Sequence, residues 1–505
     1  MVLLVIVAAM RIALAFRDEY LLYGLYYQED AFYLLNCAEH IARGQGFTVN
    51  GVHPTNGVQP LLVLFYVPLF LLADFDKTLM IRVSFVYPMI FDCLSAYLIY
   101  KILILIRRKE YDKNEIPWSP LIGALLYGLL FPVFFHTVSG LETGLLSMLL
   151  LFSLFLYARI LINTSCENIP ELKQYVILGL SLGFTVLARI DSAIIVAVIS
   201  TWEIFRPYPK RLWRSLILSV VPLMVSLPWW VYNVFTFGSL IPQSGISQSI
   251  DSVAMWNTFQ MLSTIADCIT VLFSVTKMNQ MPLIMYIGWI ILVSSCIWLC
   301  LRHFPLWRFL RMHYHYTFLL PVAIACVCYA IYYVGFFSAP YFIPRYMQPF
   351  RIIMIIVAAI SIPVIVVRWK VTRPTRILLW FIALAAVSNT LLRYPRNFYS
   401  ESNASFYRMG LWALQHPHEK VGMHQSGITG FVASNVVNLD GKVNYNALNA
   451  RLNGDLGQYI INEGLTYLAD WDTLVVPMIK EVNKYGIDFK FVDSVNDVKI
   501  YKRIN

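Results

Sequence analysis

The stretch Gln59–Ala73, QPLLVLFYVPLFLLA, decides how the rest of the chain is threaded through a membrane. The run is apolar, but it is shorter than the roughly 20 helical residues that span a bilayer. If it crosses, the basic cluster at 107–113 lies outside the cell; if it lies along the interface, that cluster lies inside. In the second case the later basic loops all fall on the cytoplasmic side, where positive residues concentrate. The sequence therefore predicts an interfacial helix at 59–73.

The composition is that of a polytopic membrane protein. The 505 residues are 58% hydrophobic and 13% charged, about half the charge fraction of a soluble protein. The net charge of +10 is explained by basic loops that act as topology signals, so nucleic-acid binding is not expected. With an inside N-terminus, the apolar runs predict about 11 spans, the first being a retained helix rather than a cleaved leader. They cover about 1–16, 79–106, 118–137, 140–160, 174–188, 190–205, 211–235, 281–302, 316–336, 346–368 and 375–393.

Several polar segments fall on the outer face in this topology, and the basic connections on the other face are too short to hold a catalytic domain. We therefore expect any chemistry outside the cytoplasm. The outer segments are the first loop 17–78 with its juxtamembrane helices, the turn 136–144, the loop 238–249, the segment 339–349 and the C-terminal part. The predicted domains are an all-α transmembrane domain, 1–393, and a small extracytoplasmic α/β domain, 394–505.

The C-terminal part changes character, because polar residues return between short apolar runs. Two segments, 455–464 and 478–485, have helical patterns. Strands are predicted at 420–424, 435–440, 466–470, 473–477, 489–493 and 498–502.

Two adjacent acids, Glu29 and Asp30, begin a helix in the first outer loop. Acids favour a helix N-terminus for structural reasons alone, through capping and the helix dipole. They could equally supply a general base at the boundary between water and lipid, where partial burial raises a carboxylate pKa and a nearby cation keeps the group ionised.

The same outer loop continues into GQGFTVNGVHPTNGVQP, residues 44–60. Its glycines and prolines exclude a regular helix, and a turn-rich loop over the membrane is expected. An ordinary connection is the alternative, but the length favours a binding loop containing His53, Asn56 and Gln59.

Three further sites combine charge with membrane helices. Glu142 lies near the outer end of a span, where an acid is a functional candidate by default, although it could simply reach water. Arg189 and Asp191 are expected in a turn between two short helices, each with its own partner, a structural ion pair being the alternative. Arg345 enters a span from the outer side, where a guanidinium can hold phosphate, or can anchor the interface beside Tyr346.

Other signals are weak. Asp92 lies deep in a span, where it could simply bond a neighbouring helix. His136 and His416 lack metal-ligand spacing, and no phosphate-binding glycine loop of the usual nucleotide kinds occurs.

A series of short motifs runs along the chain in a fixed order. They are EDAFY (29–33), GQGF (44–47), PTNG (54–57), GLET (140–143), ARID (188–191), NVFTFGSLIPQSG (233–245) and RYMQP (345–349), followed by VVNLDGKVN (436–444). Their order resembles the C-type (GT-C) membrane glycosyltransferases, which include protein O-mannosyltransferases, the lipid A aminoarabinose transferase and arabinofuranosyltransferases. The similarity is greatest to uncharacterised bacterial members and covers nearly the whole chain. One departure concerns the first acid, because family members often have two aspartates; Asp30 is favoured as the base, with Glu29 close behind.

The resemblance implies an inverting transfer of a sugar from a polyprenyl-phosphate donor to an acceptor hydroxyl of a glycan, lipid or protein. Asp30 or Glu29 would be the base. Arg345, with Arg189 and Tyr346, would bind the donor phosphate. Glu142 and Asp191 would hold sugar hydroxyls or orient the arginines. Further substrate contacts would come from His53, Asn56, Gln59, Gln243 and Ser244. No cofactor and no metal are expected, although some relatives use a divalent ion. The resemblance also implies that the protein is integral to a bacterial plasma membrane, with its active site and C-terminal domain facing the periplasm or the outside.

Two rival functions remain open from the sequence. One is a polysaccharide polymerase or ligase that uses a pyrophosphate-linked glycan and needs a second arginine at the phosphates, for which Arg189 is available. The other is a transporter or lipid flippase, which predicts midplane polar residues in repeated halves, a pattern that the chain lacks.

Overall fold

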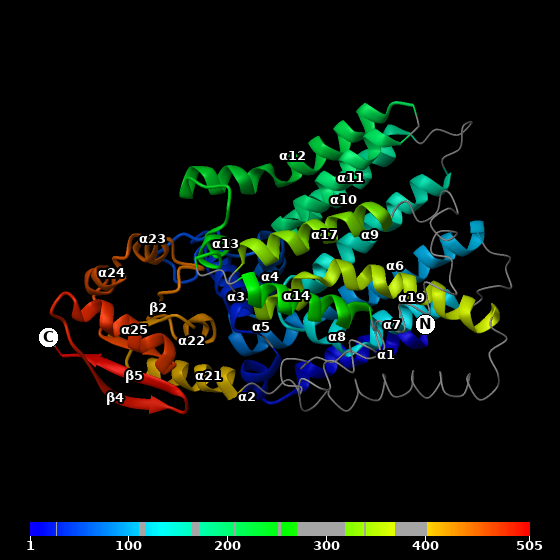
Figure 1. Ribbon diagram of the computed structural model, residues 1–505. Coiled ribbons are helices and arrows are strands. Elements are labelled where there is room, and N and C mark those ends of the chain that lie inside the picture. Colours follow the sequence, from blue (N-terminus) through cyan, green and yellow to red (C-terminus); the bar gives the residue numbers. More distant parts are fainter. Residues whose placement is uncertain are drawn as a thin grey trace.

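The computed structural model describes residues 1–26, 28–110, 118–163, 171–206, 209–250, 254–269, 319–337, 340–368 and 401–504. Long helices run side by side in a bundle, and the C-terminal domain caps one end of it (Figure 1). The main helices of the bundle are α1 (Val2–Ile12), α6 (Val86–Glu110), α9 (Thr143–Asn163), α10 (Leu172–Ala188), α11 (Ala193–Phe205), α12 (Arg211–Phe237), α14 (Ala254–Ile269), α17 (Leu319–Phe336) and α19 (Gln348–Arg368).

The chain is an integral membrane protein. Among the described residues, four helices are long and apolar enough to cross a bilayer, or five if one bent pair is counted as a span. The four are Lys77–Ile106, Thr143–Ile162, Arg211–Phe237 and Leu319–Phe336. The predicted spans 281–302 and 375–393 lie outside the described residues, as does the predicted domain boundary at 393/394.

Short helices fill the first predicted outer loop: η1 (Ala13–Phe16), α2 (Glu19–Leu21), η2 (Leu22–Tyr26), α3 (Glu29–Ala42), α4 (Pro60–Leu72) and α5 (Lys77–Ser84). The 13 residues of α4 form the helix predicted at 59–73. At a rise of 1.5 Å per residue this helix is about 20 Å long, well short of the hydrocarbon layer. Its own length therefore favours the interfacial placement, which stays a prediction. It packs against α3, which carries the acid pair.

The segment predicted as one span at 118–137 is not a single straight helix. It forms α7 (Ser119–Leu129) and α8 (Phe131–Thr137), which meet at an angle of 54°. Pro132 explains the break, because proline has no N–H to donate to the preceding turn and is tolerated only at a helix start.

A buried ion pair ties the first helix to the middle of the bundle. Arg11 Nε lies 2.8 Å from Asp92 Oδ2, and both side chains are fully buried. The same oxygen accepts a hydrogen bond of 2.6 Å from Thr137 Oγ1 at the end of α8. Asp92 is therefore a structural link between α1, α6 and α8, as the simpler interpretation of the sequence held.

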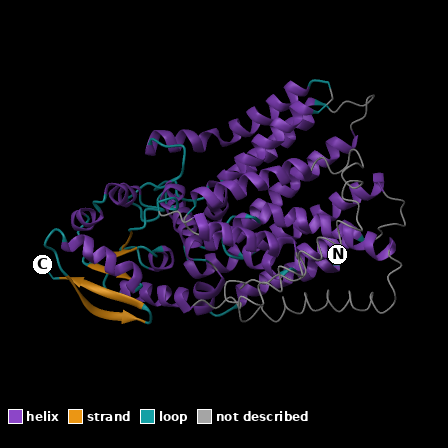
Figure 2. Cartoon of the chain, in the orientation of Figure 1, coloured by secondary structure: helices purple, strands orange, loops and turns teal. Residues whose placement is uncertain are grey.

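The C-terminal domain is a five-stranded sheet covered by helices (Figure 2). Its strands are β1 (Val421–Met423), β2 (Val436–Asn438), β3 (Tyr467–Asp470), β4 (Phe489–Val495) and β5 (Val498–Arg503), in the order β2-β1-β3-β5-β4. The first three are parallel, and β5 is antiparallel to both β3 and β4. Its helices are α21 (Glu401–Leu414), α22 (Gly427–Val432), α23 (Tyr445–Asn453), α24 (Leu456–Asn462) and α25 (Asp472–Asn483).

One predicted strand is wrong. Residues 473–477 belong to α25 instead of a strand. The β-branched run resembles a strand locally, but Val475, Met478 and Val482 recur at helical spacing and are all buried. The other predicted strands, and the helix expected over 455–464, are confirmed.

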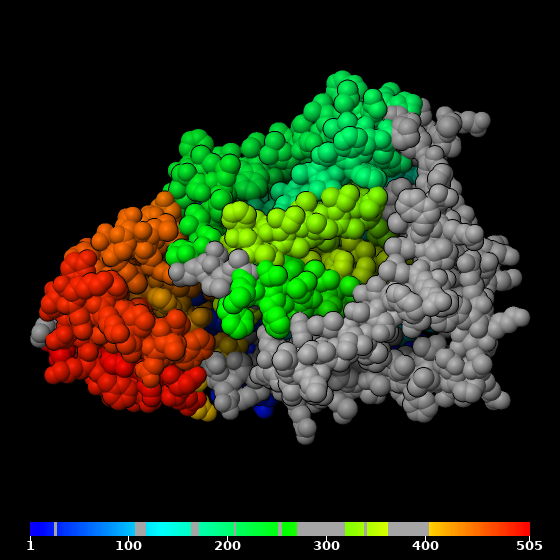
Figure 3. All heavy atoms as spheres, viewed as in Figure 1, coloured from blue at the N-terminus to red at the C-terminus, as the bar shows by residue number. Residues whose placement is uncertain are grey.

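The C-terminal domain and the first outer segment share one apolar core. The ring of Phe32 on α3 lies 5.4 Å from that of Phe431 on α22, and the Tyr23 and Tyr407 rings stack at 4.5 Å. In the space-filling view the C-terminal atoms also abut those of the α12–α13 region (Figure 3). The domain is therefore packed onto the first outer segment, including α3, which carries the acid pair.

Candidate active site

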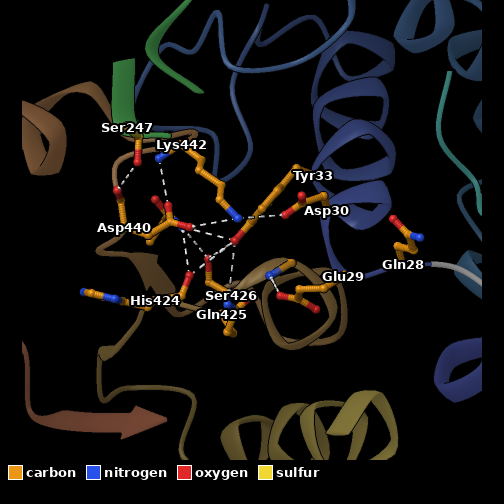
Figure 4. Close-up of polar contacts among 12 residues, drawn as sticks. Gln28, Glu29, Asp30, Tyr33, Ser247, His424, Gln425, Ser426, Asp440 and Lys442 are labelled. Atoms are coloured by element: carbon orange, nitrogen blue, oxygen red, sulfur yellow. Dashed lines mark hydrogen bonds and ion pairs between the residues drawn. The ribbon is translucent and has the colours of Figure 1, made fainter. Parts of the chain in front are cut away.

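The acid pair lies in the first turn of α3, where the chain enters the helix from an extended Gln28. The Gln28 N–H donates a 3.1 Å hydrogen bond to the carbonyl of Ser139, in the turn before α9. Glu29 and Asp30 are neighbours in sequence, yet their side chains reach different partners (Figure 4). The structure therefore separates the two acids that the sequence left as alternatives.

Glu29 faces the C-terminal domain. Its Oε2 accepts from the N–H of Ile428 at 3.1 Å, and its Oε1 accepts from the N–H of Gly427, both at the start of α22. Burial raises the pKa of Glu29 to about 8, although these two backbone donors act in the opposite direction. Glu29 thus joins α3 to α22, and both of its oxygens are occupied.

Asp30 faces a lysine that the sequence interpretation missed. Lys442 Nζ lies 3.1 Å from Asp30 Oδ1 and 3.6 Å from Asp440 Oδ2. Burial lowers the pKa of Lys442, but these two carboxylates outweigh it and raise the pKa above its ordinary range. The lysine lies within the quoted motif VVNLDGKVN, but no local pattern singles it out from other loop lysines.

Arg345 lies beside the acid pair, at the end of two short helical turns, η5 (Pro340–Phe342) and α18 (Ile343–Tyr346). Its Nη1 donates to Gln28 Oε1 at 3.3 Å, and its Nη2 donates to the Tyr346 hydroxyl at 3.1 Å. The residue is 6% exposed, and its Nε has no hydrogen-bond partner within the described residues. Asp30 and Glu142 are close enough to act electrostatically on it. Its direct partners in that part of the chain are neutral, which leaves its charge available.

Arg189 also contacts Tyr346, with its guanidinium carbon 4.0 Å from the ring centre. Its Nη2 lies 2.7 Å from Asp191 Oδ2, and its Nε lies 3.8 Å from Glu142 Oε1. The predicted turn is confirmed as η3 (Ile190–Ser192). The expectation that Arg189 and Asp191 have different partners is wrong, because Arg189 is extended at φ −159° and leaves the helix, so the two side chains can meet.

The loop 44–60 is tied to α13 (Gln243–Ser247). Asn56 Oδ1 accepts from the Gln243 N–H at 2.9 Å, and Gln243 Nε2 donates to Thr55 Oγ1 at 2.6 Å. Both side chains keep one amide atom, Asn56 Nδ2 and Gln243 Oε1, without a hydrogen-bond partner in the described part of the chain. Ser244, next in α13, is partly buried.

His53 and Gln59 are placed differently from those two residues. His53 Nε2 lies 3.6 Å from Glu463 Oε1, so the histidine faces α24 of the C-terminal domain rather than the acid pair. Gln59 precedes the first residue of α4, and its Oε1 is buried with no partner among the described residues. Across those residues, no group of three or more His, Cys, Asp or Glu side chains is arranged to hold a metal ion.

Neither a protein-family model nor a curated protein matches the chain. Solved structures do. ArnT from Cupriavidus metallidurans in the apo state aligns with a TM-score of 0.54 at 13% identity, covering 99% of this chain and 97% of that one. The oligosaccharyltransferase AglB from Archaeoglobus fulgidus, in complex with an inhibitory peptide and a dolichol-phosphate, aligns with a TM-score of 0.53 at 12% identity, covering 93% and 69%.

ArnT from Cupriavidus metallidurans bound to undecaprenyl phosphate aligns with a TM-score of 0.50 at 13% identity, covering 99% of this chain and 97% of that one. At such identities the likeness concerns the fold alone. ArnT and AglB are both GT-C glycosyltransferases, so the chain has the GT-C fold that its motifs predicted.

Proposed function

We propose that the chain is an inverting glycosyltransferase that moves a sugar from a polyprenyl-phosphate donor to an acceptor hydroxyl on the outer face of a bacterial plasma membrane. The observation that carries the proposal is that Asp30 and Arg345 lie in one polar cluster: Arg345 is hydrogen-bonded to Gln28, and Asp30, two residues further along the chain, acts on it electrostatically. A base and an uncompensated cation side by side are what this reaction needs. The GT-C fold and the lipid phosphates bound by two structural neighbours support the same class of donor.

In the proposed reaction the Asp30 carboxylate removes the proton of the acceptor hydroxyl. The acceptor oxygen then bonds to the anomeric carbon on the face opposite the phosphate, and the bond from that carbon to the phosphate oxygen breaks. Arg345 stabilises the charge that develops on the leaving polyprenyl phosphate. Preorganised charge of this kind contributes several kcal/mol to catalysis. Asp30 then returns its proton to water.

The remaining residues divide by their contacts. Glu142 and Asp191 both form ion pairs with Arg189. We therefore assign them the role of orienting that arginine rather than of binding the sugar. Asn56, Gln243 and Gln59 retain unpartnered amide atoms in the described structure, which suit sugar hydroxyls. Ser244 remains a proposed sugar contact beside Gln243, whereas the Glu463 contact of His53 favours a role in holding the loop. Tyr346 positions both arginines through its ring.

A pyrophosphate-linked donor is the second candidate, because Arg189 and Arg345 share the Tyr346 ring, at 4.0 and 4.9 Å. The charge balance favours the monophosphate. Two carboxylates already face Arg189, while the described partners of Arg345 are neutral. One available guanidinium matches one phosphate.

Transfer assays on membranes test the proposal. Membranes from cells that express the wild type are given radiolabelled sugars on either polyprenyl phosphate or polyprenyl pyrophosphate, with endogenous acceptors. We expect labelled product from the monophosphate donor, and loss of about 10²–10⁴-fold in Asp30→Asn. Glu29→Gln, at equal protein level, should retain most activity, since Glu29 serves the contact with α22.

Each alternative gives a distinct result. Product from the pyrophosphate donor alone would favour the polymerase or ligase. Unchanged transfer in Asp30→Asn, in Glu29→Gln and in the double variant would remove the base assignment. Uptake of the labelled compound into sealed vesicles without a new glycosidic bond would indicate a transporter.

A further inference from the structure

We infer that Lys442, supplied by the C-terminal domain, is a positioning residue that keeps Asp30 ionised and separate from Arg345. The inference rests on the proposed function, since it assigns a partner to the proposed base. It makes the C-terminal domain a part of the active site instead of an appendage to it.

The geometry places the Lys442 ammonium between two carboxylates (Figure 4). It lies 3.1 Å from Asp30 Oδ1 and 3.6 Å from Asp440 Oδ2, with a side chain only 12% exposed. A buried ammonium is costly unless it is paired, and so is a buried carboxylate. The Asp30–Lys442 ion pair therefore offsets the cost of burying either charge alone.

The turn that carries Lys442 is fixed from several sides. The Lys442 N–H donates to Asp440 Oδ1 at 2.7 Å, and the N–H of Gly441, at φ 79°, donates to Asn438 Oδ1 at 3.1 Å. Ser247 Oγ of α13 donates to the Asp440 carbonyl at 2.8 Å. A turn held in this way presents its lysine in one place, which a positioning role requires.

The lysine also explains why Asp30 and Arg345 remain apart. Asp30 acts electrostatically on Arg345, and the two charges attract. If Asp30 lacked Lys442, Arg345 would be the nearby cation able to neutralise it, and the guanidinium would leave the place where it can meet a phosphate. With Lys442 present, the base has its own counter-ion and the charge of Arg345 is free for the donor.

A purely structural role for Lys442 is the competing explanation, because the contact joins two domains. Those domains have other ties, among them the two backbone hydrogen bonds to Glu29 and the Phe32–Phe431 ring contact. A docking role predicts loss of folded protein, whereas a positioning role changes how the rate depends on pH. The groups that surround Asp30 and enter that dependence are Glu29, Tyr33, Tyr341, Arg345, Asp440 and Lys442.

The experiment measures kcat/KM against pH for purified wild type, Lys442→Met and Lys442→Arg in detergent with a polyprenyl-phosphate sugar. We expect Lys442→Met to lose at least about tenfold in kcat/KM at neutral pH. The acid limb of its profile should move upward by about one to three pH units, the usual effect of losing a neighbouring opposite charge. Lys442→Arg keeps the charge and should keep the position of the acid limb.

Lys502→Met is the matched control, because Lys502 is a half-exposed lysine of the same domain that pairs with Glu419. It should leave the profile unchanged. Folding is followed by thermal unfolding, where the double variant Asp30→Asn/Lys442→Met should melt above Lys442→Met, since it leaves one carboxylate, that of Asp440, without its lysine partner instead of two.

The outcomes separate the two proposals. A wild type without transfer from any polyprenyl-phosphate sugar overturns the proposed function, while the melting comparison still tests the Asp30–Lys442 pair. An active wild type whose Lys442→Met variant keeps its acid limb, with activity falling only in proportion to folded protein, overturns the positioning role alone.

Discussion

Arg345 and Gln28, 317 positions apart in the chain, are joined by a hydrogen bond of 3.3 Å from Nη1 to Oε1. Gln28 precedes the helix that carries Asp30, so this bond sets the arginine beside the acid pair. Gln28 is neutral, and it therefore holds the guanidinium without consuming its charge. In the proposed reaction this arrangement leaves Asp30 for the acceptor hydroxyl and Arg345 for the donor phosphate.

Replacing Arg345 should impair catalysis more than folding. Arg345→Ala removes the cation that stabilises the leaving phosphate, so we expect kcat/KM to fall by about 10²–10³-fold. Arg345→Lys keeps the positive charge but loses the planar guanidinium, so its kcat/KM should lie between those of the wild type and Arg345→Ala. The measurement is initial transfer rate against donor concentration.

The control for that series is Arg43→Ala. The Arg43 side chain is 44% exposed and pairs with Glu39, so its loss should leave kcat/KM within about twofold of wild type. An Arg345→Ala variant as active as Arg43→Ala would contradict the phosphate assignment.

The buried Arg11–Asp92 pair should matter for stability and not for chemistry. Arg11→Met leaves Asp92 as an uncompensated buried charge, which costs about 3–5 kcal/mol. Arg11→Met/Asp92→Leu removes both charges and should recover most of that loss. Thermal unfolding in detergent checks the order of the three proteins, and a single variant that melts with the wild type would refute the structural role.

The sequence could identify these sites where the chemistry is local. An acid pair at a helix start and an arginine between two short helices are visible because capping and helix length are local rules. Asp30, Glu29 and Arg189 could therefore be proposed as site residues from the sequence, and the GT-C fold could be predicted from the order of such motifs.

Contacts between distant segments could not be found in this way. Lys442 meets Asp30 across 412 positions, and nothing in its own neighbourhood indicates that it does so. The separate orientations of Glu29 and Asp30 likewise depend on α22, which lies nearly 400 positions away. The strand predicted at 473–477 is wrong for a related reason. The β-branched residues favour a strand locally, but burying one face of a helix against the rest of the domain stabilises α25 instead.

Glu29 should make stability depend on pH in a defined direction. Its pKa is about 8 in the folded protein and near 4.5 when exposed, so the folded form binds the extra proton between these values. The contribution is complete below pH 4.5 and is lost as the pH rises through 8. We expect the unfolding temperature to fall over this interval in wild type.

Glu29→Gln tests that assignment because glutamine does not titrate. The variant can keep only one acceptor for the two N–H groups of Gly427 and Ile428, so it should be less stable at low pH. Its unfolding temperature should nevertheless fall less between pH 4.5 and 8. Parallel curves for the two proteins would show that another group carries the dependence.

Transfer should not require a divalent metal. The lipid phosphate is already a good leaving group, and the Lys442 ammonium occupies the space between Asp30 and Asp440 where a cation would bind. We expect kcat/KM to be unchanged after treatment with EDTA. Adding Mg²⁺ or Mn²⁺ to the treated enzyme should not raise it. A chelated enzyme that loses activity and regains it with Mg²⁺ or Mn²⁺ would require a metal ligand set that this prediction does not include.

Gly57 should be sensitive although it touches no substrate in the proposed reaction. A Cβ added there would lie 1.7 Å from the Lys442 carbonyl oxygen and 3.2 Å from Gln243 Cγ, so Gly57→Ala must displace the turn that holds Lys442. A shift of about 1 Å in a catalytic group can lower the rate 10²-fold, and we expect a loss of that order in kcat/KM.

Gly335→Ala in α17 is the matched control, because a Cβ there meets nothing within 4 Å. Because Gly57→Ala acts through Lys442, its acid limb should move in the same direction as that of Lys442→Met. An active Gly57→Ala enzyme with a wild-type pH profile would mean that the close packing of loop 44–60 on the C-terminal domain does not position Lys442.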